Sequence, residues 1–373
     1  MGWRVDNDLQ QLLRESARGH LGAAGGAAHA RQVRGLEQGF DPAAWQAFGE
    51  LGWTGILLPE RLGGAELGLE PALTLAEELG RALAPEPFVA AAIIAATVLA
   101  ASVAPAAAAL GAELATGARS VTLAWQEQRR TLGLPDFATR FEHGRLRGAK
   151  VHVPAWQAGT VLLVAAAGVD GPVVLAVDPA APGLTARAER LSDGSMVADL
   201  EFDGVAIDEA AVLLAGPVAR SALDLALDRG TIALSAQLEG LSGALWQVTA
   251  DYIQQRVQFG SRLADFQALR HRMVDLFTQN ELAAASWRAA AAALEQGGGA
   301  RVAIHAAKAR CAQAAQDMSR WAIQYHGAFG YTDEADVGLY VHAALAWSTW
   351  LGNPAAHRRA ALLAHRNGTA SHG

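Results

Sequence analysis

Two short stretches of the sequence combine residue types that can hold a ligand with residues that permit tight turns. The first, Arg256–Gly260, places an arginine, an amide and an aromatic ring directly before a glycine. The second, Gln324–Thr332, reads QYHGAFGYT and again joins amide, aromatic and glycine residues. Both adjoin long helical patterns, so a helix–helix turn with glycine supplying backbone freedom also accounts for each. The residue types alone leave both interpretations open.

Several motifs that carry well-known chemistry do not occur in the sequence. Neither G-x-x-x-x-G-K-[ST] nor a strand followed by GxGxxG is found, so neither common phosphate loop is predicted. HExxH does not occur and the histidines form no spaced ligand set, so no metal site is predicted. Ser242 in GLSGAL is one residue short of the G-x-S-x-G nucleophile motif and lies within a helical pattern.

Composition and charge exclude further classes of protein. The 373 residues carry a net charge of −7, and no lysine or arginine run forms a basic patch, so a nucleic-acid partner is not expected. The single cysteine, Cys311, rules out a disulfide framework and fits a reducing cytoplasm. The N-terminal stretch MGWRVDNDLQQLLRE has charges where an export signal needs an apolar segment. A cytoplasmic location is therefore expected.

One uncharged stretch, Phe88–Leu110, is long enough to span a bilayer. It consists mostly of alanine, which is weakly apolar, and Pro105 interrupts it. These features favour a buried helix pair over a membrane span, and no membrane contact is predicted.

The elements that position the two stretches fall into three regions. Residues 1–118 show helical patterns, including a helix with Asp41 as N-cap and Pro42 at its first position. Residues 119–215 change to short alternating or β-branched runs typical of antiparallel strands. Residues 216–373 return to long helical patterns, in which Gly230, Gly240 and Gly243 indicate a kink or a close helix–helix contact. The predicted fold class is α+β, mostly α: a helical N-terminal domain, a small antiparallel β domain and a C-terminal four-helix bundle.

Over nearly its full length the chain resembles the acyl-CoA dehydrogenases. RVQFGSRLADFQALRHRMVDL is similar to the family signature R-x-Q-F-G-x-x-[IL]-x-x-F-Q-x-x-[KRH]-H-x-x-A-D, which is specific. QYHGAFGYT is similar to Q-x-x-G-G-x-G-[YF]-T, with Ala328 replacing one glycine. GWTGILLPERLGG, EELGRALAPEPF and LRGAKVHVPAWQAG support the match by their order and spacing. Residues 339–361 are most similar to an actinobacterial and proteobacterial subgroup acting on bulky or steroid-derived CoA thioesters.

The resemblance implies an FAD site shared between subunits. Arg256 would pair with the pyrophosphate, to which guanidinium offers paired donors, and Gln258 and Phe259 would meet the adenosine. Gly260 would permit the turn. Gln324 and Gly327 would line the same cofactor. The family is usually tetrameric, a dimer of dimers, and passes electrons to an electron-transfer flavoprotein.

The implied reaction removes a proton from the thioester α-carbon and needs one desolvated carboxylate as base. Many family members carry a glutamate where this chain has Leu351-Gly352. Others place an acid on the helix before R-x-Q-F-G, and there the chain offers Asp228, two residues from the expected position, Gly230. The alternative for Asp228 is an acid at a helix N-terminus, stabilised by the helix dipole.

Two other acids on the same helical pattern are weaker candidates for the base. Asp224 lies one turn before Asp228 on a similar face, and Glu239 lies too far along the pattern.

The middle region departs from the family pattern. The family's [TS]-E-P and G-S-D are replaced by LAWQEQRRTLGLPDF, in which Gln126 and Glu127 are candidates for replacement flavin contacts. Two interpretations follow: an FAD-dependent acyl-CoA dehydrogenase with Asp228 as base, or a non-catalytic subunit that completes the FAD site of a second, dehydrogenase-like chain. The sequence does not identify the acyl group.

Overall fold

The computed structural model describes residues 7–23, 25–129, 132–157, 159–297 and 300–370. The first six residues, part of the stretch that argues against an export signal, lie outside these ranges. The chain forms two compact units. The helical unit comprises Met1–Gln32, Leu73–Ala84 and Thr231–Gly373, and the sheet-containing unit comprises Val33–Ala72 and Pro85–Gly230.

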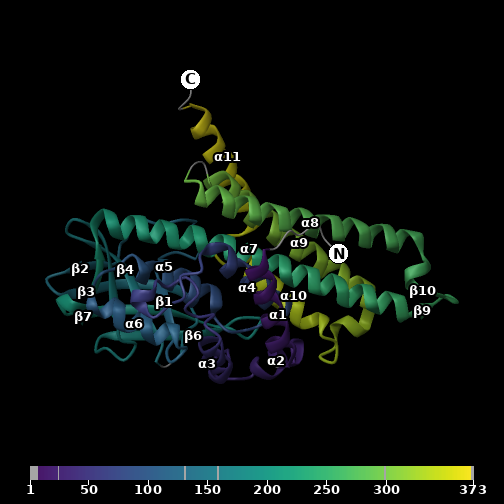
Figure 1. Ribbon diagram of the computed structural model, residues 1–373, viewed down its shortest axis with the longest axis horizontal. Helices are drawn as coiled ribbons and strands as arrows, with labels where there is room; N and C mark the ends of the chain where they lie inside the picture. Colours follow the sequence, from purple (N-terminus) through teal and green to yellow (C-terminus); the bar gives the residue numbers. More distant parts are fainter. Residues whose placement is uncertain (1–6, 24, 130–131, 158, 298–299, 371–373) are drawn as a thin grey trace. The chain divides into compact units, whose positions relative to one another are not determined.

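Helices occupy the first part of the chain, up to Ala115 (Figure 1). Asp41 caps α3 as predicted: its side chain accepts a hydrogen bond from the Ala43 amide, and Pro42 is the first helical residue. The helices are α1 (Asp8–Ala23), α2 (Ala27–Val33), α3 (Pro42–Glu50), η1 (Glu60–Leu62), α4 (Leu69–Arg81), η2 (Val89–Ala95), α5 (Ala96–Ala100) and α6 (Pro105–Ala115).

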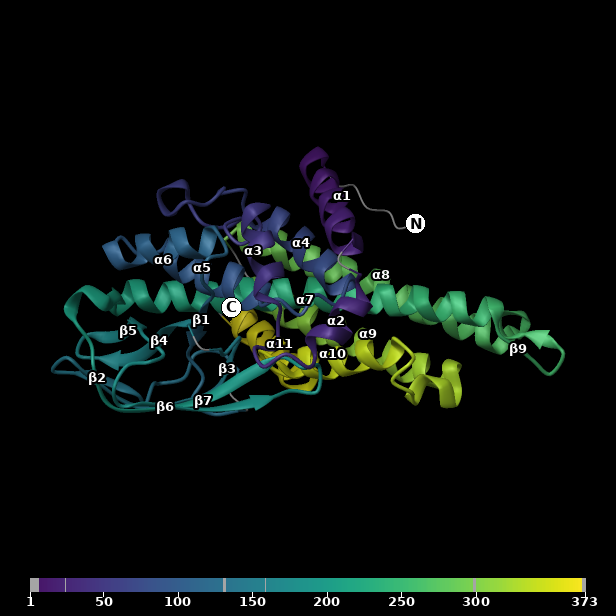
Figure 2. The ribbon, with the colours of Figure 1, turned by 90° about the horizontal axis from the view of Figure 1, so that it is seen from below.

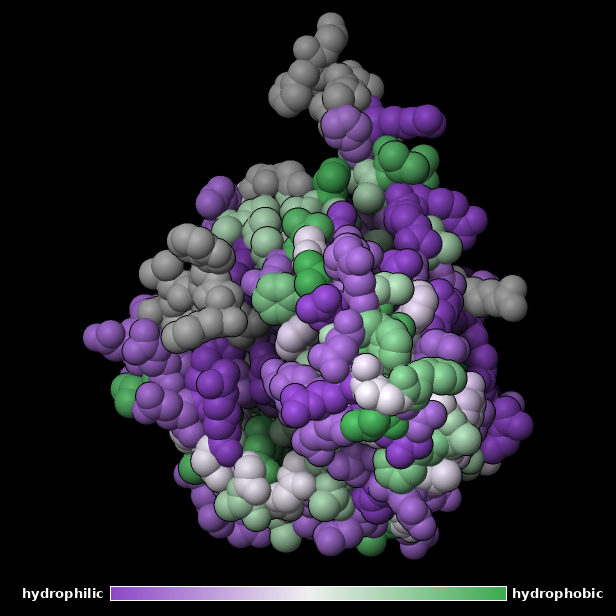
Figure 3. Space-filling model, turned by 90° about the vertical axis from the view of Figure 1, so that its right-hand side faces the viewer, coloured by the Kyte–Doolittle hydropathy of each residue, from purple (hydrophilic) through white to green (hydrophobic). Residues whose placement is uncertain are grey.

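The uncharged stretch Phe88–Leu110 forms the π-helical η2, then α5 and most of α6. Every residue of η2 is buried. Among the described residues, no helix is long and apolar enough to cross a membrane. On the face shown in Figure 3, hydrophobic side chains are interspersed with hydrophilic ones.

Among the residues that the structure describes, the sheet of the sheet-containing unit has eight strands, in the order β6-β7-β3-β2-β4-β5-β8, with β1 also paired to β4. Most pairs are antiparallel, but β1 and β2 each run parallel to β4, so the sheet is mixed where the sequence predicts only antiparallel pairs. The strands are β1 (Val121–Ala124), β2 (Arg140–Glu142), β3 (Arg145–Pro154), β4 (Val161–Gly168), β5 (Gly171–Val177), β6 (Leu184–Arg190), β7 (Met196–Ala206) and β8 (Val212–Ala215); the 3-10 turn η3 (Glu209–Ala211) precedes β8.

Long helices make up the C-terminal part. Within the helical unit, Figures 1 and 2 both show α8 beside α9, with the β9–β10 hairpin at the end where α7 passes into α8. The elements are α7 (Gly216–Gln255), β9 (Val257–Gln258), β10 (Ser261–Arg262), η4 (Leu263–Asp265), α8 (Gln267–Glu295), α9 (Ala300–His326), η5 (Gly327–Tyr331), α10 (Val337–Thr349) and α11 (Pro354–Ala370).

The close helix–helix contact that glycines predict lies between α4 and α7. A Cβ atom on Gly80 would lie 2.0 Å from the Gln237 carbonyl oxygen, and one on Gly240 would lie 2.0 Å from the Glu77 carbonyl oxygen. Only glycine at both positions lets the two backbones approach this closely. The predicted fold class is confirmed, whereas the boundaries 1–118, 119–215 and 216–373 stay a prediction.

Candidate functional site

The R-x-Q-F-G stretch forms the exit from α7 and a tight hairpin. Helix α7 ends at Gln255, and β9 then pairs antiparallel with β10. The turn residues Phe259 and Gly260 have φ values of +53° and +77°. Two consecutive positive φ values match a two-residue hairpin turn, in which glycine fits the second position without strain. The glycine therefore has the turn role that the sequence predicts.

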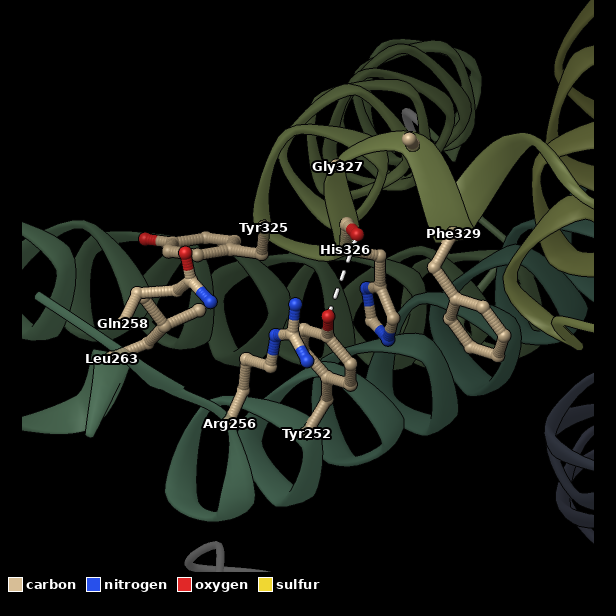
Figure 4. Close-up of a pocket in the computed structure, with 9 residues that line it drawn as sticks. Tyr252, Arg256, Gln258, Leu263, Tyr325, His326, Gly327 and Phe329 are labelled. Carbon is tan, nitrogen blue, oxygen red and sulfur yellow. Dashed lines mark hydrogen bonds between the residues drawn. The ribbon is translucent and has the colours of Figure 1, made fainter.

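Behind this hairpin lies a pocket of about 620 Å³ in the helical unit. Figure 4 shows residues from the end of α7 and from the hairpin on one side, facing residues from the end of α9 and from η5. The pocket is lined by Tyr252, Arg256, Gln258, Leu263, Tyr325, His326, Gly327, Ala328 and Phe329. The two stretches singled out from the sequence thus meet at one site.

Aromatic rings form one side of the pocket. Tyr252 stacks on His326 with ring centroids 4.1 Å apart, and lies nearly parallel to Phe329 at 6.4 Å. The His326 Nδ1 atom lies 2.8 Å from the Ala322 carbonyl oxygen, so Nδ1 carries the proton and Nε2 keeps its lone pair. Burial lowers the pKa of His326, which favours this neutral form. The pocket therefore offers flat π surfaces and a hydrogen-bond acceptor.

Arg256 supplies the positive charge of the pocket. Its guanidinium is exposed, and no acidic side chain of the described residues forms an ion pair with it. Gln258 lines the pocket beside it and donates from Nε2 to the Val257 carbonyl oxygen at 2.9 Å. Gly327 has a φ of +60°, and a Cβ atom there would meet no atom within 4 Å. An anion that approaches this corner meets a free fork of N–H donors next to bare backbone.

The other residues predicted for the FAD site lie away from the pocket lining. Phe259 is 92% exposed at the hairpin tip and makes an edge-on contact with Phe266. Gly260 is exposed in the same turn, and Gln324 is exposed on α9. Their contacts with a cofactor stay predictions, since each would need a molecule that reaches past the pocket.

Gln126 and Glu127 belong to the sheet-containing unit. The Gln126 side chain donates to the Gln128 carbonyl oxygen at 2.8 Å. The Glu127 carboxylate accepts from Lys150 at 2.7 Å and from the amides of Ala138 and Thr139 at 2.7 and 2.9 Å. Burial raises the pKa of Glu127, but these hydrogen bonds outweigh it and leave the pKa below its usual value. Glu127 therefore holds its own loop together.

Asp228 is half-buried within α7, in the same unit as Gln126. Because α7 begins at Gly216, Asp228 lies in its fourth turn, and the interpretation as an N-terminal acid is wrong. The helix continues without interruption through Gly230, so the two positions point about 200° apart around its axis. The role of Asp228 as base stays a prediction.

The two weaker candidates for the base are both engaged in other contacts. Asp224 pairs with Arg220 at 3.1 Å. Glu239 is fully buried and accepts from Asn280 at 2.8 Å.

The turn at Leu351-Gly352 carries no carboxylate and is held by buried bases. Lys308, fully buried in α9, donates from Nζ to the carbonyl oxygens of Trp347, Ser348 and Gly352 at 3.1 to 3.3 Å. His357, also fully buried, has its Nε2 atom 2.8 Å from the Leu351 carbonyl oxygen. These bonds satisfy carbonyl groups at the C-terminal end of α10 and in the turn that follows.

Comparison with known proteins assigns the family. The family model described as "Acyl-CoA dehydrogenase, C-terminal domain" matches residues 219–362, and "Acyl-CoA dehydrogenase, N-terminal domain" matches residues 7–106. The acyl-CoA dehydrogenase IpdE2 of Mycobacterium tuberculosis is 29% identical over 92% of this chain and 93% of its own length.

Two solved structures extend the similarity to the fold. A variant of the Tcur3481–Tcur3483 steroid ACAD (acyl-CoA dehydrogenase) has a TM-score of 0.86 and 27% identity, covering 97% of this chain and 98% of that one. The ChsE4–ChsE5 complex from Mycobacterium tuberculosis has a TM-score of 0.86 and 24% identity, covering 95% and 96%. The chain belongs to the acyl-CoA dehydrogenase family, whose members are oxidoreductases.

Sequence reasoning missed several residues that line the pocket. Tyr252 is one helical turn before Arg256, and this i, i+4 spacing was a signal that both share a face. His326 and Phe329 lie inside the second stretch, but only the ring stacking shows what they form. Leu263 and Tyr325 carry no sequence signal that separates them from core residues.

Proposed function

We propose that the chain is an FAD-dependent acyl-CoA dehydrogenase that introduces an α,β double bond into a CoA thioester. One observation carries the proposal: the pocket between the hairpin and η5 joins an arginine, which has no acidic partner within the described ranges, to bare glycine backbone and stacked aromatic rings. These features fit the ADP part of FAD, since phosphates need cationic donors and adenine needs a flat apolar surface.

The residues of the chain have distinct proposed roles. Arg256 binds the pyrophosphate, and Gly327 lets the cofactor approach the backbone. FAD, when bound, accepts the hydride that leaves the β-carbon. Asp228 is the candidate base that removes the α-proton.

Arg256→Ala tests the cofactor site. A charge-assisted hydrogen bond contributes about 1.5–3 kcal/mol, so the Kd for FAD should rise about 10- to 100-fold. Arg320→Ala is the matched control, because Arg320 is an exposed arginine of α9 paired with Asp317 and does not line the pocket. Unchanged FAD retention in Arg256→Ala would show that the cofactor binds elsewhere.

A second candidate function is a subunit that completes the FAD site of another dehydrogenase-like chain. Specific observations favour it: the turn at Leu351-Gly352 carries no carboxylate, Glu127 is bound within its own loop, and Asp228 points about 200° away from position 230. The two-chain names of the Tcur3481–Tcur3483 and ChsE4–ChsE5 structures support such an assembly. In either case we propose an oligomer and an electron-transfer flavoprotein as acceptor.

Asp228→Asn separates the two candidates. A general base contributes about 10²–10⁴ in rate, so turnover should fall by about that factor while FAD is retained if Asp228 is the base. A steroid-derived CoA thioester is the first substrate to test, given the similarity to a steroid ACAD. Turnover at the wild-type level would show that Asp228 is not the base and would favour the second candidate.

A further inference from the structure

The segment that follows the pocket wall is tied to α2 by one arginine. Arg31 donates from Nη1 to the backbone carbonyl oxygen of Asp333 and from Nη2 to the Asp336 carboxylate, the latter at 2.6 Å. The carbonyl lies just after η5, and Asp336 directly precedes α10. One planar guanidinium therefore bridges the two ends of the turn that joins η5 to α10.

The bridged segment continues directly from the pocket wall. Gly327, Ala328 and Phe329 line the pocket, and the chain reaches Asp333 only four residues after Phe329. Most of residues 327–336 are exposed, so core packing does little to fix their position. Within the segment, Thr332 bonds back to the Phe329 carbonyl oxygen through its amide at 3.0 Å and its hydroxyl at 2.8 Å. These two hydrogen bonds connect the residue that precedes Asp333 to Phe329 in the pocket lining.

Arg31 is also close to the point where the chain leaves the helical unit. Gln32 is the last residue of the first segment of that unit, and Val33 already belongs to the sheet-containing unit. Gly25 and Gly26, with φ values of +100° and +52°, precede α2. Helix α2 is thus a short element that follows two glycines and ends at the boundary between the two units. Arg31, within this helix, supplies the guanidinium contact to residues 333–336.

We infer that Arg31 is a positioning residue that holds the Gly327–Asp336 wall in the conformation that binds the cofactor. The inference rests on the proposed function in one respect, namely that this pocket takes the ADP part of FAD. Arg31 is not among the residues that line the pocket; it acts through Asp333 and Asp336.

The first test needs no cofactor. In Arg31→Ala, amide hydrogen exchange of the full chain without FAD should become about three- to fivefold faster at residues 328–336. The expected change is small because a single partly exposed ion pair contributes little to the free energy of local opening. Arg320→Ala removes a surface ion pair with Asp317 from α9 and should leave the exchange rates of residues 328–336 unchanged. Equal exchange in wild type and Arg31→Ala would overturn the inference whatever binds in the pocket.

The second test measures FAD binding. The Kd for FAD should rise about three- to fivefold in Arg31→Ala and less in Arg31→Lys, which keeps the charge but loses the fork. Asp336→Asn added to Arg31→Ala should cause little further loss, because both remove the same contact. If Arg256→Ala weakens FAD binding and Arg31→Ala does not, the positioning role is wrong and the proposed function stands. If Arg256→Ala has no effect, the proposed function itself fails.

Discussion

At the scale of single residues, the buried histidine of the α10–α11 turn has a fixed protonation state. His357 donates from Nε2 to the Leu351 carbonyl oxygen, so its bare Nδ1 accepts from the Nδ1–H of His305, 3.0 Å away. Burial, followed by the nearby ammonium of Lys308, lowers the pKa of His357 to about 3. Protonation would place a second charge beside Lys308 and break the bond between the two rings.

This pKa makes a prediction about stability and pH. In the unfolded chain the pKa of His357 is about 6.5, so the unfolded state binds the proton more readily than the folded state. The contribution of neutral His357 to the free energy of unfolding is therefore fully present above about pH 6.5 and is lost as the pH decreases toward 3. Each pH unit in this window costs about 1.4 kcal/mol from His357. His357→Gln keeps an N–H for Leu351 without the titration, so its denaturant midpoint should depend less on pH between 7 and 5. His271→Gln, an exposed change on α8, should keep the wild-type slope.

Individual site residues were predictable to the extent that their motif fixed the backbone. Arg256, Gln258 and Gly327 each lie in or beside a glycine turn and line one pocket, whereas their contacts with FAD stay a prediction. The sequence does not predict that Phe259 points into solvent. Two positive φ values define the turn, but the direction of the side chain depends on the surrounding tertiary structure. Nor does the sequence find Tyr325, whose hydroxyl donates to the Leu269 carbonyl oxygen across to α8.

At the scale of elements, the crossing of α4 and α7 is the close helix–helix contact that the glycines in the sequence predict. Gly240→Ala would place a methyl group 2.0 Å from the Glu77 carbonyl oxygen, a backbone atom that cannot swing away. Overpacking of this kind costs about 1–3 kcal/mol or more. Gly338→Ala on α10 is the control, because a Cβ there meets nothing within 4 Å and alanine favours helix by up to about 1 kcal/mol. Chemical denaturation should show loss in the first variant and none in the second; equal stability would contradict the close crossing.

The strands illustrate what sequence periodicity leaves undetermined. Their positions follow from β-branched runs between glycines, and strands run from Val121 to Ala215 as expected. The parallel pairing of β1 and β2 with β4 depends on the order in which the chain adds strands to the sheet. The alternation of apolar and polar residues within one strand does not indicate which strand lies beside it. The alternative role of Asp228 as an acid at a helix N-terminus is wrong for a different reason: residue propensities do not show where α7 begins.

At the scale of the whole molecule, the two candidate functions differ in how much of a dehydrogenase site this chain provides. The residues proposed for the ADP part of FAD lie in the helical unit, whereas Gln126 and Asp228 belong to the sheet-containing unit. The two candidate functions share the first set and differ over the second.

The measurement that tests the central claim most directly is the visible absorbance spectrum of the purified full chain, with flavin counted per chain, before and after addition of a steroid-derived acyl-CoA. We expect bound FAD that is bleached by the thioester: near one FAD per chain for the protein alone if it is catalytically complete, or FAD only after co-expression with a second dehydrogenase-like chain if it completes a shared site. A chain that stays colourless under both conditions would rule out both candidate functions.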